Sequence, residues 1–271
     1  MTPRPFRVSD RRRETTDTWT IELEPADGGA APPFRPGQFN MLYAFGVGEV
    51  PISISGDPAA GGPLEHTVRA VGPVSAAICR APPGEQLGVR GPFGSSWPLA
   101  GADGRHLVVV AGGVGLAPLR PVVLEALSLR ARLEGLVLLC GGRSPGDLLF
   151  RSQLDAWRED PRLDLGVTVD SAESGWLDNV GVVTTLIDGA PFDPALATAF
   201  IVGPEIMMRF AVQALLARGM AAADLYVSIE RNMKCAVTQC GRCQFGPSFA
   251  CREGPVMGFA EIERFLGVRE L

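Results

Sequence analysis

The first hundred residues alternate between large apolar and polar side chains in short segments. In segments 19–24 and 39–45 the apolar side chains fall on every second position, which is the period of a half-buried β-strand. Glycine and proline clusters, as at residues 32–33 and 61–63, separate such segments. Short strands divided by turn residues predict an antiparallel sandwich or barrel. One short helix is expected near residues 74–80.

From about residue 101 the pattern changes to apolar runs that alternate with segments of helical spacing. Residues 107–111 form a continuous apolar run, which is typical of a parallel strand covered on both faces. We expect a helix from Pro118, because the missing N–H of proline costs nothing in a first helical turn. Further strands are expected at 136–139, 199–202 and 225–229. This order predicts βαβ units and therefore a mainly parallel sheet.

The chain thus divides into three parts. We predict an antiparallel β-barrel over residues 1–100, a parallel-sheet α/β domain over 101–230 and a small cysteine-containing segment over 231–271. A length of 271 residues accommodates two domains of ordinary size and such an appendage.

Charge and hydropathy narrow the partners and the compartment. The formal net charge is -5 at pH 7, which argues against nucleic acid as the main partner. The first ten residues lack the apolar core of a secretory signal, and the run 107–119 is too short and glycine-rich to span a bilayer. We therefore expect a cytoplasmic protein with no membrane span. In a reducing compartment, Cys79 and Cys140 are expected to be ordinary buried residues.

Four of the six cysteines lie close together near the end of the sequence. They are Cys235, Cys240, Cys243 and Cys251, with the spacing C-x4-C-x2-C-x7-C. A turn at Gly241 lets neighbouring backbone amides point inward, which a negatively charged sulfur cluster needs for stabilisation. A C-x4-C-x2-C spacing followed by a later cysteine is that of plant-type [2Fe-2S] sites.

Two other roles for these cysteines stay open. A structural zinc site normally shows paired C-x2-C knuckles or nearby histidines, whereas this segment has one C-x2-C and no nearby histidine. Disulfides need an oxidising compartment, and the sequence offers no signal for export. Spacing and compartment therefore favour an iron–sulfur cluster.

A glycine-rich loop is the second candidate site. The sequence GGVGLAP at 112–118 lies between a buried strand and a helix start, where a nucleotide phosphate can approach the backbone. It departs from the G-x-G-x-x-G fingerprint, because Pro118 stands in place of the third glycine. The next strand ends in CGGRS at 140–144 instead of an acidic residue for the ribose. A tight strand-to-helix turn without a ligand is the alternative.

Taken in order, these motifs resemble a known family. A barrel followed by AGGVGLAPLRP, CGGRSPGDLLF and VGPEIMM resembles the ferredoxin-NADP reductase family, which joins a flavin barrel to a nicotinamide-nucleotide domain. The continuation SIERNMKCAVTQCGRCQFGPSFACREGP resembles the gamma (diaphorase) subunits of cytoplasmic NiFe hydrogenases, also called sulfhydrogenases. It is also similar to the electron-transfer subunits of dihydroorotate dehydrogenase and anaerobic sulfite reductase. The resemblance covers essentially the whole chain.

The resemblance implies a flavin site, for FAD in preference to FMN. The family's flavin-ring motif falls on Val50, Pro51, Ile52 and Ser53. The last three should lie against the isoalloxazine ring, whereas many relatives have a phosphate-binding arginine where this chain has Val50. A second flavin motif falls on Gly72, Val74 and Ser75, with Ser75 at a helix start suited to a pyrophosphate. The alternatives are a barrel strand with Ser53 facing outward and a simple helix cap at Ser75.

The resemblance also implies a nicotinamide-nucleotide site. The residues on the pyrophosphate side would be Gly113, Gly115 and Pro118, and those near the nicotinamide would be Gly203, Pro204 and Met207. Arg143 and Ser144 fall where relatives bind the adenosine ribose. A cation there can pair with a 2′-phosphate, which favours NADPH over NADH, and a solvent-facing arginine is the alternative.

The implied activity is electron transfer between NAD(P)H, a flavin, a [2Fe-2S] cluster and the catalytic subunit of a hetero-oligomeric complex. Hydrogenase subunits are the expected partners, and a dihydroorotate dehydrogenase or anaerobic sulfite reductase complex is the alternative. Hydride transfer needs no acid–base residue, which fits a chain whose two histidines, His66 and His106, lie beside no nucleophile motif. A zinc-stapled flavin- and nucleotide-binding regulator, or a sensor that only binds reduced nucleotide, are alternatives of other classes.

Overall fold

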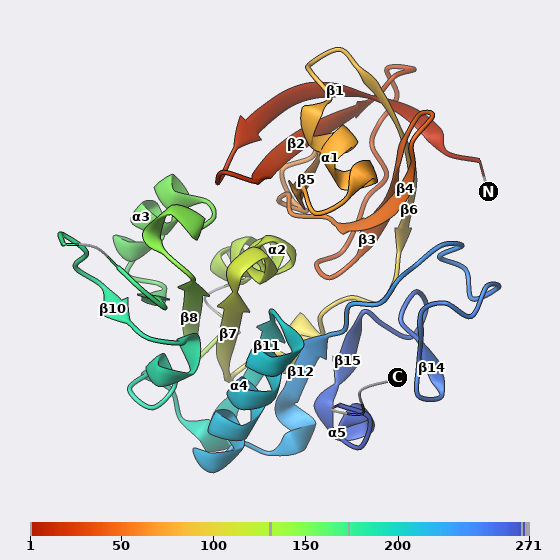
Figure 1. Ribbon diagram of the computed structural model, residues 1–271. Helices are drawn as coiled ribbons and strands as arrows, with labels where there is room; N and C mark the ends of the chain where they lie inside the picture. Colours follow the sequence, from red (N-terminus) through yellow and green to blue (C-terminus); the bar gives the residue numbers. More distant parts are fainter. Residues whose placement is uncertain (1, 130–131, 173, 267, 269–271) are drawn as a thin grey trace.

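The chain folds into an antiparallel barrel, an α/β domain and a C-terminal cysteine segment (Figure 1). This computed structural model describes residues 2–129, 132–172, 174–266 and 268. In the view of Figure 1 the barrel lies above the α/β domain, and the blue C-terminal segment lies beside both. No helix in the described part of the chain is long and apolar enough to cross a membrane.

Six strands form the barrel sheet in the order β4-β3-β6-β1-β2-β5. Their bounds are β1 Arg4–Arg13, β2 Thr18–Pro25, β3 Phe39–Ala44, β4 Gly48–Ser53, β5 Leu64–Arg69 and β6 Gln86–Phe93. The two edge strands approach each other at an isolated bridge between Ile54 and His66, which closes the sheet. Buried residues such as Ile21 fill the barrel, and helix α1 (Pro73–Arg80) adds Ile78 to the same core.

The second sheet has seven strands in the order β10-β9-β8-β7-β11-β12-β15. Their bounds are β7 His106–Gly112, β8 Gly135–Gly142, β9 Asp164–Val169, β10 Asn179–Val180, β11 Ala197–Val202, β12 Leu225–Ser228 and β15 Val256–Gly258. Neighbouring strands from β10 to β12 run parallel, and β15 pairs antiparallel with β12. The predicted fold class, a flavin-type barrel followed by a parallel-sheet domain, is confirmed.

Helices cover both faces of this sheet, as the continuous apolar run of β7 predicts. Helices α2 (Leu116–Ser128) and α3 (Arg151–Arg158) share one core with Val109, and α4 (Glu205–Ala217) shares the opposite core with Val108. Pro118 lies in the first turn of α2, as expected. Short 3-10 turns complete the connections: η1 Leu99–Ala102, η2 Gly113–Gly115, η4 Pro145–Asp147, η5 Val183–Leu186, η6 Pro194–Leu196 and η7 Ala222–Asp224.

The cysteine segment leaves the α/β sheet after β12 and returns to it. Strands β13 (Gln244–Phe245) and β14 (Ser248–Phe249) form a small hairpin within it. The chain then rejoins the sheet through β15 and continues into α5 (Phe259–Ile262). The part of the chain between β12 and β15 is therefore held to the sheet at both of its ends.

Candidate functional site

The carboxyl ends of the parallel strands bring the expected nucleotide-binding residues to one edge of the sheet. Strands β7 and β11 are parallel neighbours, with Ala111 opposite Val202 at their carboxyl ends. Strand β8 follows β7 in sequence and lies on its other side, so the strand order reverses between β7 and β11. In doubly wound sheets, ligands bind in the crevice that opens at such a switch point.

Glycines allow the loops at this crevice to pack closely. A Cβ atom at Gly115 would lie 2.4 Å from the carbonyl oxygen of Val202. A Cβ atom would lie 2.1 Å from the Met207 Cε at Gly203 and 2.7 Å from it at Gly112. The loops after β7 and β11 therefore pack against each other and against the Met207 side chain, and larger residues would force them apart.

Backbone groups at the crevice can receive an anion. Gly113 has a φ of +56° and open space where a Cβ would stand. Helix α2 begins after Gly115, and α4 begins after Pro204. Both helices thus begin just after the carboxyl ends of the neighbouring strands β7 and β11, and such helix starts favour a phosphate.

Arg143 and Ser144 lie beyond the carboxyl end of β8, beside the crevice. The Arg143 side chain is 67% exposed, and its Nη2 lies 3.7 Å from an Asp147 carboxylate oxygen. The Ser144 hydroxyl donates to the other carboxylate oxygen at 2.7 Å. The guanidinium group is therefore accessible to a ligand, while the serine is held by its own loop.

Strand β4 carries the flavin-ring motif at an edge of the barrel sheet. All of its residues are half-buried, and it pairs along one side with β3. An edge strand leaves backbone N–H and C=O groups open on its other side, but here the Ser53 carbonyl accepts a hydrogen bond from His66, and the next residue, Ile54, bridges to β5. Because side chains alternate along a strand, Pro51 and Ser53 share one face of the sheet while Ile52 lies on the other. The side chains of the three residues therefore do not form one continuous platform.

The second flavin motif lies at the start of α1, where Ser75 is buried. Its hydroxyl accepts hydrogen bonds from the backbone N–H groups of Val71 and Gly72 at 3.1 and 3.0 Å. Gly72 is the cap residue of the helix, and Val74 packs against the barrel core. The Ser75 side chain thus stabilises the local turn from the third position of the helix, whereas the N-cap itself is Gly72.

The four clustered cysteines approach one another in two pairs. The Cys240 side chain lies beside that of Cys235, and the Cys251 side chain lies beside that of Cys243. Within the described residues, no group of three cysteine, histidine or carboxylate side chains surrounds a single point. A tetrahedral zinc site needs four ligands around one point, whereas the two irons of a [2Fe-2S] cluster divide four cysteines between them. Two adjacent pairs match the division of ligands in a [2Fe-2S] cluster.

Backbone amides point at these sulfur atoms. Val237 donates to the Cys235 sulfur at 3.4 Å, and Thr238 donates to the Cys251 sulfur at 3.3 Å. Ala236 and Thr238 adopt the left-handed region with φ of 61° and 63°, which is uncommon for residues that carry a Cβ. Strain of this kind occurs where the surrounding structure enforces it. Here it accompanies amide groups directed at the sulfurs, which stabilise negative charge.

The six thiols differ in exposure: Cys240 is exposed and Cys235 half-buried, whereas Cys243, Cys251, Cys79 and Cys140 are buried. Cys240 is exposed, and backbone N–H groups, first that of Arg242, lower the pKa of its thiol to about 7. Burial raises the pKa of Cys251 to about 11. Burial also raises the pKa values of Cys79 and Cys140, to about 11 and about 12. The expectation that these last two are ordinary buried residues is confirmed.

The cysteine segment packs on the barrel beside the expected flavin strand. Phe39 and Met41 of β3 share a core with Cys243 and Cys251. Across the strand pair, Met41 lies opposite Pro51 and Phe39 lies opposite Ser53. Directly opposed residues share a face of a sheet. The structure therefore places Cys243 and Cys251 one strand away from β4, on the face that carries Pro51 and Ser53.

Arg90 and Glu49 are site residues that the sequence analysis did not find. Arg90 donates twice to the Glu49 carboxylate, at 2.7 Å each, and also donates to the carbonyl oxygens of Lys234 at 3.3 Å and Cys235 at 3.2 Å. A cavity of about 510 Å³ opens beside this pair and beside Cys235. Arg90 is 41 positions from Glu49 and more than a hundred from Lys234 and Cys235, so the sequence gives no local signal of these contacts.

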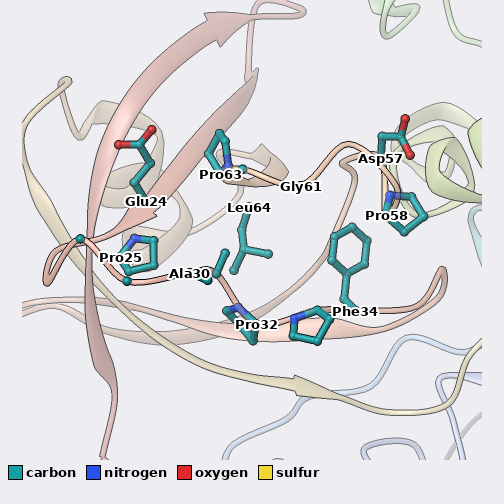
Figure 2. Close-up of a pocket in the computed structure, with 15 residues that line it drawn as sticks. Glu24, Pro25, Ala30, Pro32, Phe34, Asp57, Pro58, Gly61, Pro63 and Leu64 are labelled. Atoms are coloured by element: carbon teal, nitrogen blue, oxygen red, sulfur yellow. The ribbon is translucent and has the colours of Figure 1, made fainter.

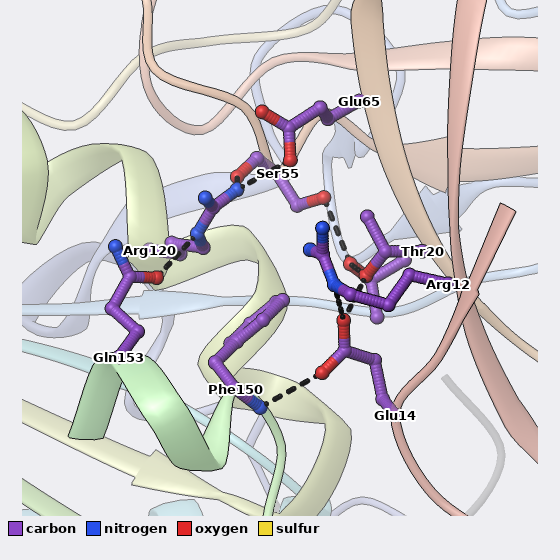
Figure 3. A network of polar contacts seen from close by, with 9 residues as sticks. Arg12, Glu14, Thr20, Ser55, Glu65, Arg120, Phe150 and Gln153 are labelled. Carbon is purple, nitrogen blue, oxygen red and sulfur yellow. Dashed lines mark hydrogen bonds and ion pairs between the residues drawn. The ribbon is translucent and has the colours of Figure 1, made fainter. Parts of the chain in front are cut away.

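A polar network joins the barrel to the α/β domain (Figure 3). Arg120 of α2 donates to the Glu65 carboxylate at 2.8 Å and to the Ser55 carbonyl at 2.7 Å. The backbone N–H of Phe150 donates to the Glu14 carboxylate at 3.0 Å. Both contacts come from segments that follow the carboxyl ends of β7 and β8. The network therefore holds the nucleotide edge of the sheet against the barrel.

A second cavity lies on the barrel and has a different character (Figure 2). It has a volume of about 430 Å³ and is lined mainly by proline, glycine and alanine, with Glu24 and Asp57 as its charged groups. Its lining, as far as the chain is described, includes none of the residues expected to bind flavin, nucleotide or metal. We therefore place the candidate site at the crevice, β4 and the cysteine segment.

Comparison with known proteins agrees with this geometry. Residues 109–213 match a family model described as the oxidoreductase NAD-binding domain. The chain is 34% identical over 242 residues to the gamma subunit of Sulfhydrogenase 2 from Pyrococcus furiosus, with 83% of each chain covered. The chain belongs to the family of the sulfhydrogenase gamma subunits and the dihydroorotate dehydrogenase electron-transfer subunits. The sequence motifs predicted this family.

Two further matches extend over nearly the whole of this chain. A protein from Methanopyrus kandleri named "Probable dihydroorotate dehydrogenase B (NAD(+)), electron transfer subunit" is 32% identical over 272 residues, covering 98% of this chain and 95% of the relative. The structure of an NADH-dependent reduced ferredoxin-NADP oxidoreductase, studied for flavin-based electron bifurcation, aligns with a TM-score of 0.74 at 23% identity. It covers 98% of this chain and 94% of its own, which shows the shared fold. The chain is thus an NAD(P)H-dependent oxidoreductase of an electron-transfer family.

Proposed function

We propose that the chain is the electron-transfer subunit of a hetero-oligomeric oxidoreductase and uses NADPH or NADH, FAD and a [2Fe-2S] cluster. FAD accepts a hydride from the nicotinamide and can release electrons singly, and a [2Fe-2S] cluster carries one electron at a time. The observation that carries the proposal is the packing of Cys243 and Cys251 on β3, directly beside β4. Two redox sites that exchange electrons must lie close together, and this packing supports a cluster beside a flavin on β4.

The nucleotide would bind across the crevice between β7 and β11. Gly113, Gly115 and the helix starts would hold the pyrophosphate, and the Gly203–Met207 side would hold the nicotinamide. The accessible guanidinium of Arg143 supports NADPH as the preferred nucleotide, because it can pair with a 2′-phosphate. This chain's part in hydride transfer is to orient the nicotinamide and exclude water.

The flavin ring would lie along the open edge of β4, where backbone groups can bind its polar atoms. Val50 offers no charge for the flavin phosphates, and the Ser75 hydroxyl is already engaged by Val71 and Gly72. We therefore assign phosphate binding to backbone N–H groups in the first turn of α1, with Gly72 giving close access.

The cluster would be held by Cys235, Cys240, Cys243 and Cys251. The pairwise approach of the thiols and the two amide contacts to sulfur support this ligand set. All six cysteines are free thiols, which supports the cytoplasm as the compartment, since thiols stay reduced there.

The partner would be a catalytic subunit, for which hydrogenase is the first choice. The support is the match to sulfhydrogenase gamma subunits. A dihydroorotate dehydrogenase partner is the second candidate, because a relative with that name matches over nearly the whole chain. Residues 231–252 contain four basic residues and no acidic residue, although the chain as a whole is acidic. The exposed surface of residues 231–252 would therefore suit a partner with an acidic surface.

Metal analysis after anaerobic purification tests the proposal. We expect two irons, two acid-labile sulfides and one FAD for each chain. Cys240→Ser should lose the iron and keep the FAD, whereas Cys79→Ser, a buried cysteine outside the segment, should keep both. Stoichiometric zinc in place of iron would contradict the electron relay and support the zinc-stapled regulator. Nickel in a complex purified from the native host would identify hydrogenase as the partner.

A further inference from the structure

The guanidinium of Arg90 connects the expected flavin strand to the first cysteine. Arg90 lies on β6, and its side chain is only 8% exposed. It forms a two-point ion pair with Glu49 of β4 and donates to the carbonyl oxygens of Lys234 and Cys235. Four of the five N–H donors of a guanidinium can serve these four acceptors. One side chain thus links three segments that are far apart in the sequence.

The other cations of the cysteine segment are more exposed or are placed elsewhere. Lys234 and Arg242 are exposed, so water and salt screen their charges. Arg252 forms an ion pair with Glu253, and Arg231 lies over the Phe245 ring. Among the described residues, Arg90 is therefore the buried cation that contacts the backbone of Cys235.

We propose that Arg90 is a positioning residue for the iron–sulfur cluster, and that the Arg90–Glu49 pair tunes the cluster's reduction potential. The inference rests on the proposed function, because it requires a cluster at the four cysteines. Arg90 fixes the Cys235 backbone relative to β4, and so fixes the spacing between cluster and flavin.

The charges of the pair act on the cluster in opposite directions. Reduction adds one negative charge to the cluster, so a nearby cation favours the reduced state and a nearby carboxylate disfavours it. Partial burial strengthens both effects, since charge interactions grow as the effective dielectric constant falls. Removal of Arg90 should lower the reduction potential, and removal of the Glu49 charge should raise it.

Redox titration monitored by electron paramagnetic resonance tests the inference. Arg90→Met should lower the one-electron equilibrium constant for cluster reduction about tenfold, which equals about 59 mV. Glu49→Gln should shift the potential upward. Arg90→Lys keeps the charge but loses the fork geometry, so its potential should stay near wild type while a chelator removes iron faster.

A matched control comes from the α/β domain. Arg105 pairs with Asp224 at 2.9 Å and donates to the Ala197 carbonyl at 2.7 Å, so it makes the same kinds of contact away from the cysteines. Arg105→Met should leave the cluster potential unchanged. If Arg90→Met does not fold, Glu49→Gln and Arg90→Lys still give the two readouts.

The outcomes separate this inference from the proposed function. Opposite shifts for Arg90→Met and Glu49→Gln would support tuning by charge. Shifts in the same direction, or no shift in either variant, would overturn the inference while leaving the cluster in place. A wild-type protein without iron would instead contradict the proposed function itself.

Discussion

His66 is a buried titratable side chain that holds the flavin strand in place. Its Nδ1 donates to the Ser53 carbonyl at 3.0 Å, and its Nε2 lies 3.1 Å from the Asn40 amide nitrogen. A carbonyl can only accept, so the neutral ring with its proton on Nδ1 satisfies both contacts. Burial lowers the pKa of His66 to about 4.

This pKa makes folding sensitive to acid. Below about pH 6.5 the unfolded chain binds a proton at His66, while the folded chain stays neutral there until about pH 4. The free energy of unfolding should fall by about 3 kcal/mol over that interval and be independent of His66 at higher pH. Urea unfolding of wild type and His66→Gln at several pH values measures the difference. An equal pH dependence in both proteins would refute the assignment, and His106→Gln is the control.

Two glycines of the nucleotide loop should respond differently to an added methyl group. At Gly115 the methyl would collide with the Val202 carbonyl, so Gly115→Ala should displace the loop and weaken NADP⁺ binding at least tenfold. At Gly113 the space is open, and the expected cost is about 1–2 kcal/mol for the left-handed backbone. Nucleotide titration and thermal unfolding measure both effects. Similar affinities for both variants would argue against close packing at the crevice.

At the scale of elements, the contact between α2 and the barrel sets how the proposed nucleotide site lies relative to the proposed flavin site. Hydride transfer requires the reacting atoms to approach within about 3–3.5 Å, so small displacements have large effects. Arg120→Met removes the bonds to Ser55 and Glu65. We expect about a tenfold loss of kcat with NADPH and ferricyanide, and little change in the dissociation constant for NADP⁺.

Arg158 supplies the control for that experiment. It pairs with Asp178 inside the α/β domain at 2.7 Å, and within the described residues it forms no hydrogen bond or ion pair with the barrel. Arg158→Met should therefore keep wild-type kcat. Normal turnover in Arg120→Met would show that the network is not needed to position the domains.

The elements that the sequence predicted are those with a long or strongly periodic pattern. The apolar run of β7 and the position of Pro118 gave the strand and helix around the nucleotide loop. Strands β13 and β15 have two and three residues, which is too short for a period to appear. The pairing of β15 with β12 is a tertiary contact, so the return of the cysteine segment to the sheet could not be predicted from local pattern.

The site shows the same division between local and long-range information. Cysteine spacing and the glycine loop are local, and the predictions of the ligand set and of the nucleotide edge rest on them. The direction of the Ser75 hydroxyl depends on the turn at Val71 and Gly72, which composition does not reveal. The contact of Arg90 with Cys235 joins residues that only the fold brings together.

At the scale of the whole molecule, the proposed nucleotide, flavin and cluster sites follow one another along the fold. The last of them carries the exposed cations Lys234, Arg242 and Arg252, which we call the basic face. Lys234 is exposed on that face, and it is the single lysine of the sequence. Acylation by an amine reagent should modify Lys234 rapidly in the free chain and slowly in the complex. The N-terminal amine is the internal reference. Equal modification in both states would place the partner on another surface.

The central claim is that NAD(P)H reduces a cluster held by the four cysteines through a flavin bound to the same chain. Anaerobic addition of NADPH or NADH to the purified holoprotein, followed by visible and electron paramagnetic resonance spectra, tests it most directly. The account predicts loss of oxidised flavin absorbance together with the signal of a reduced [2Fe-2S] cluster, and only the flavin change in Cys240→Ser. An iron-loaded wild-type protein whose flavin is reduced while its cluster stays oxidised would contradict the account.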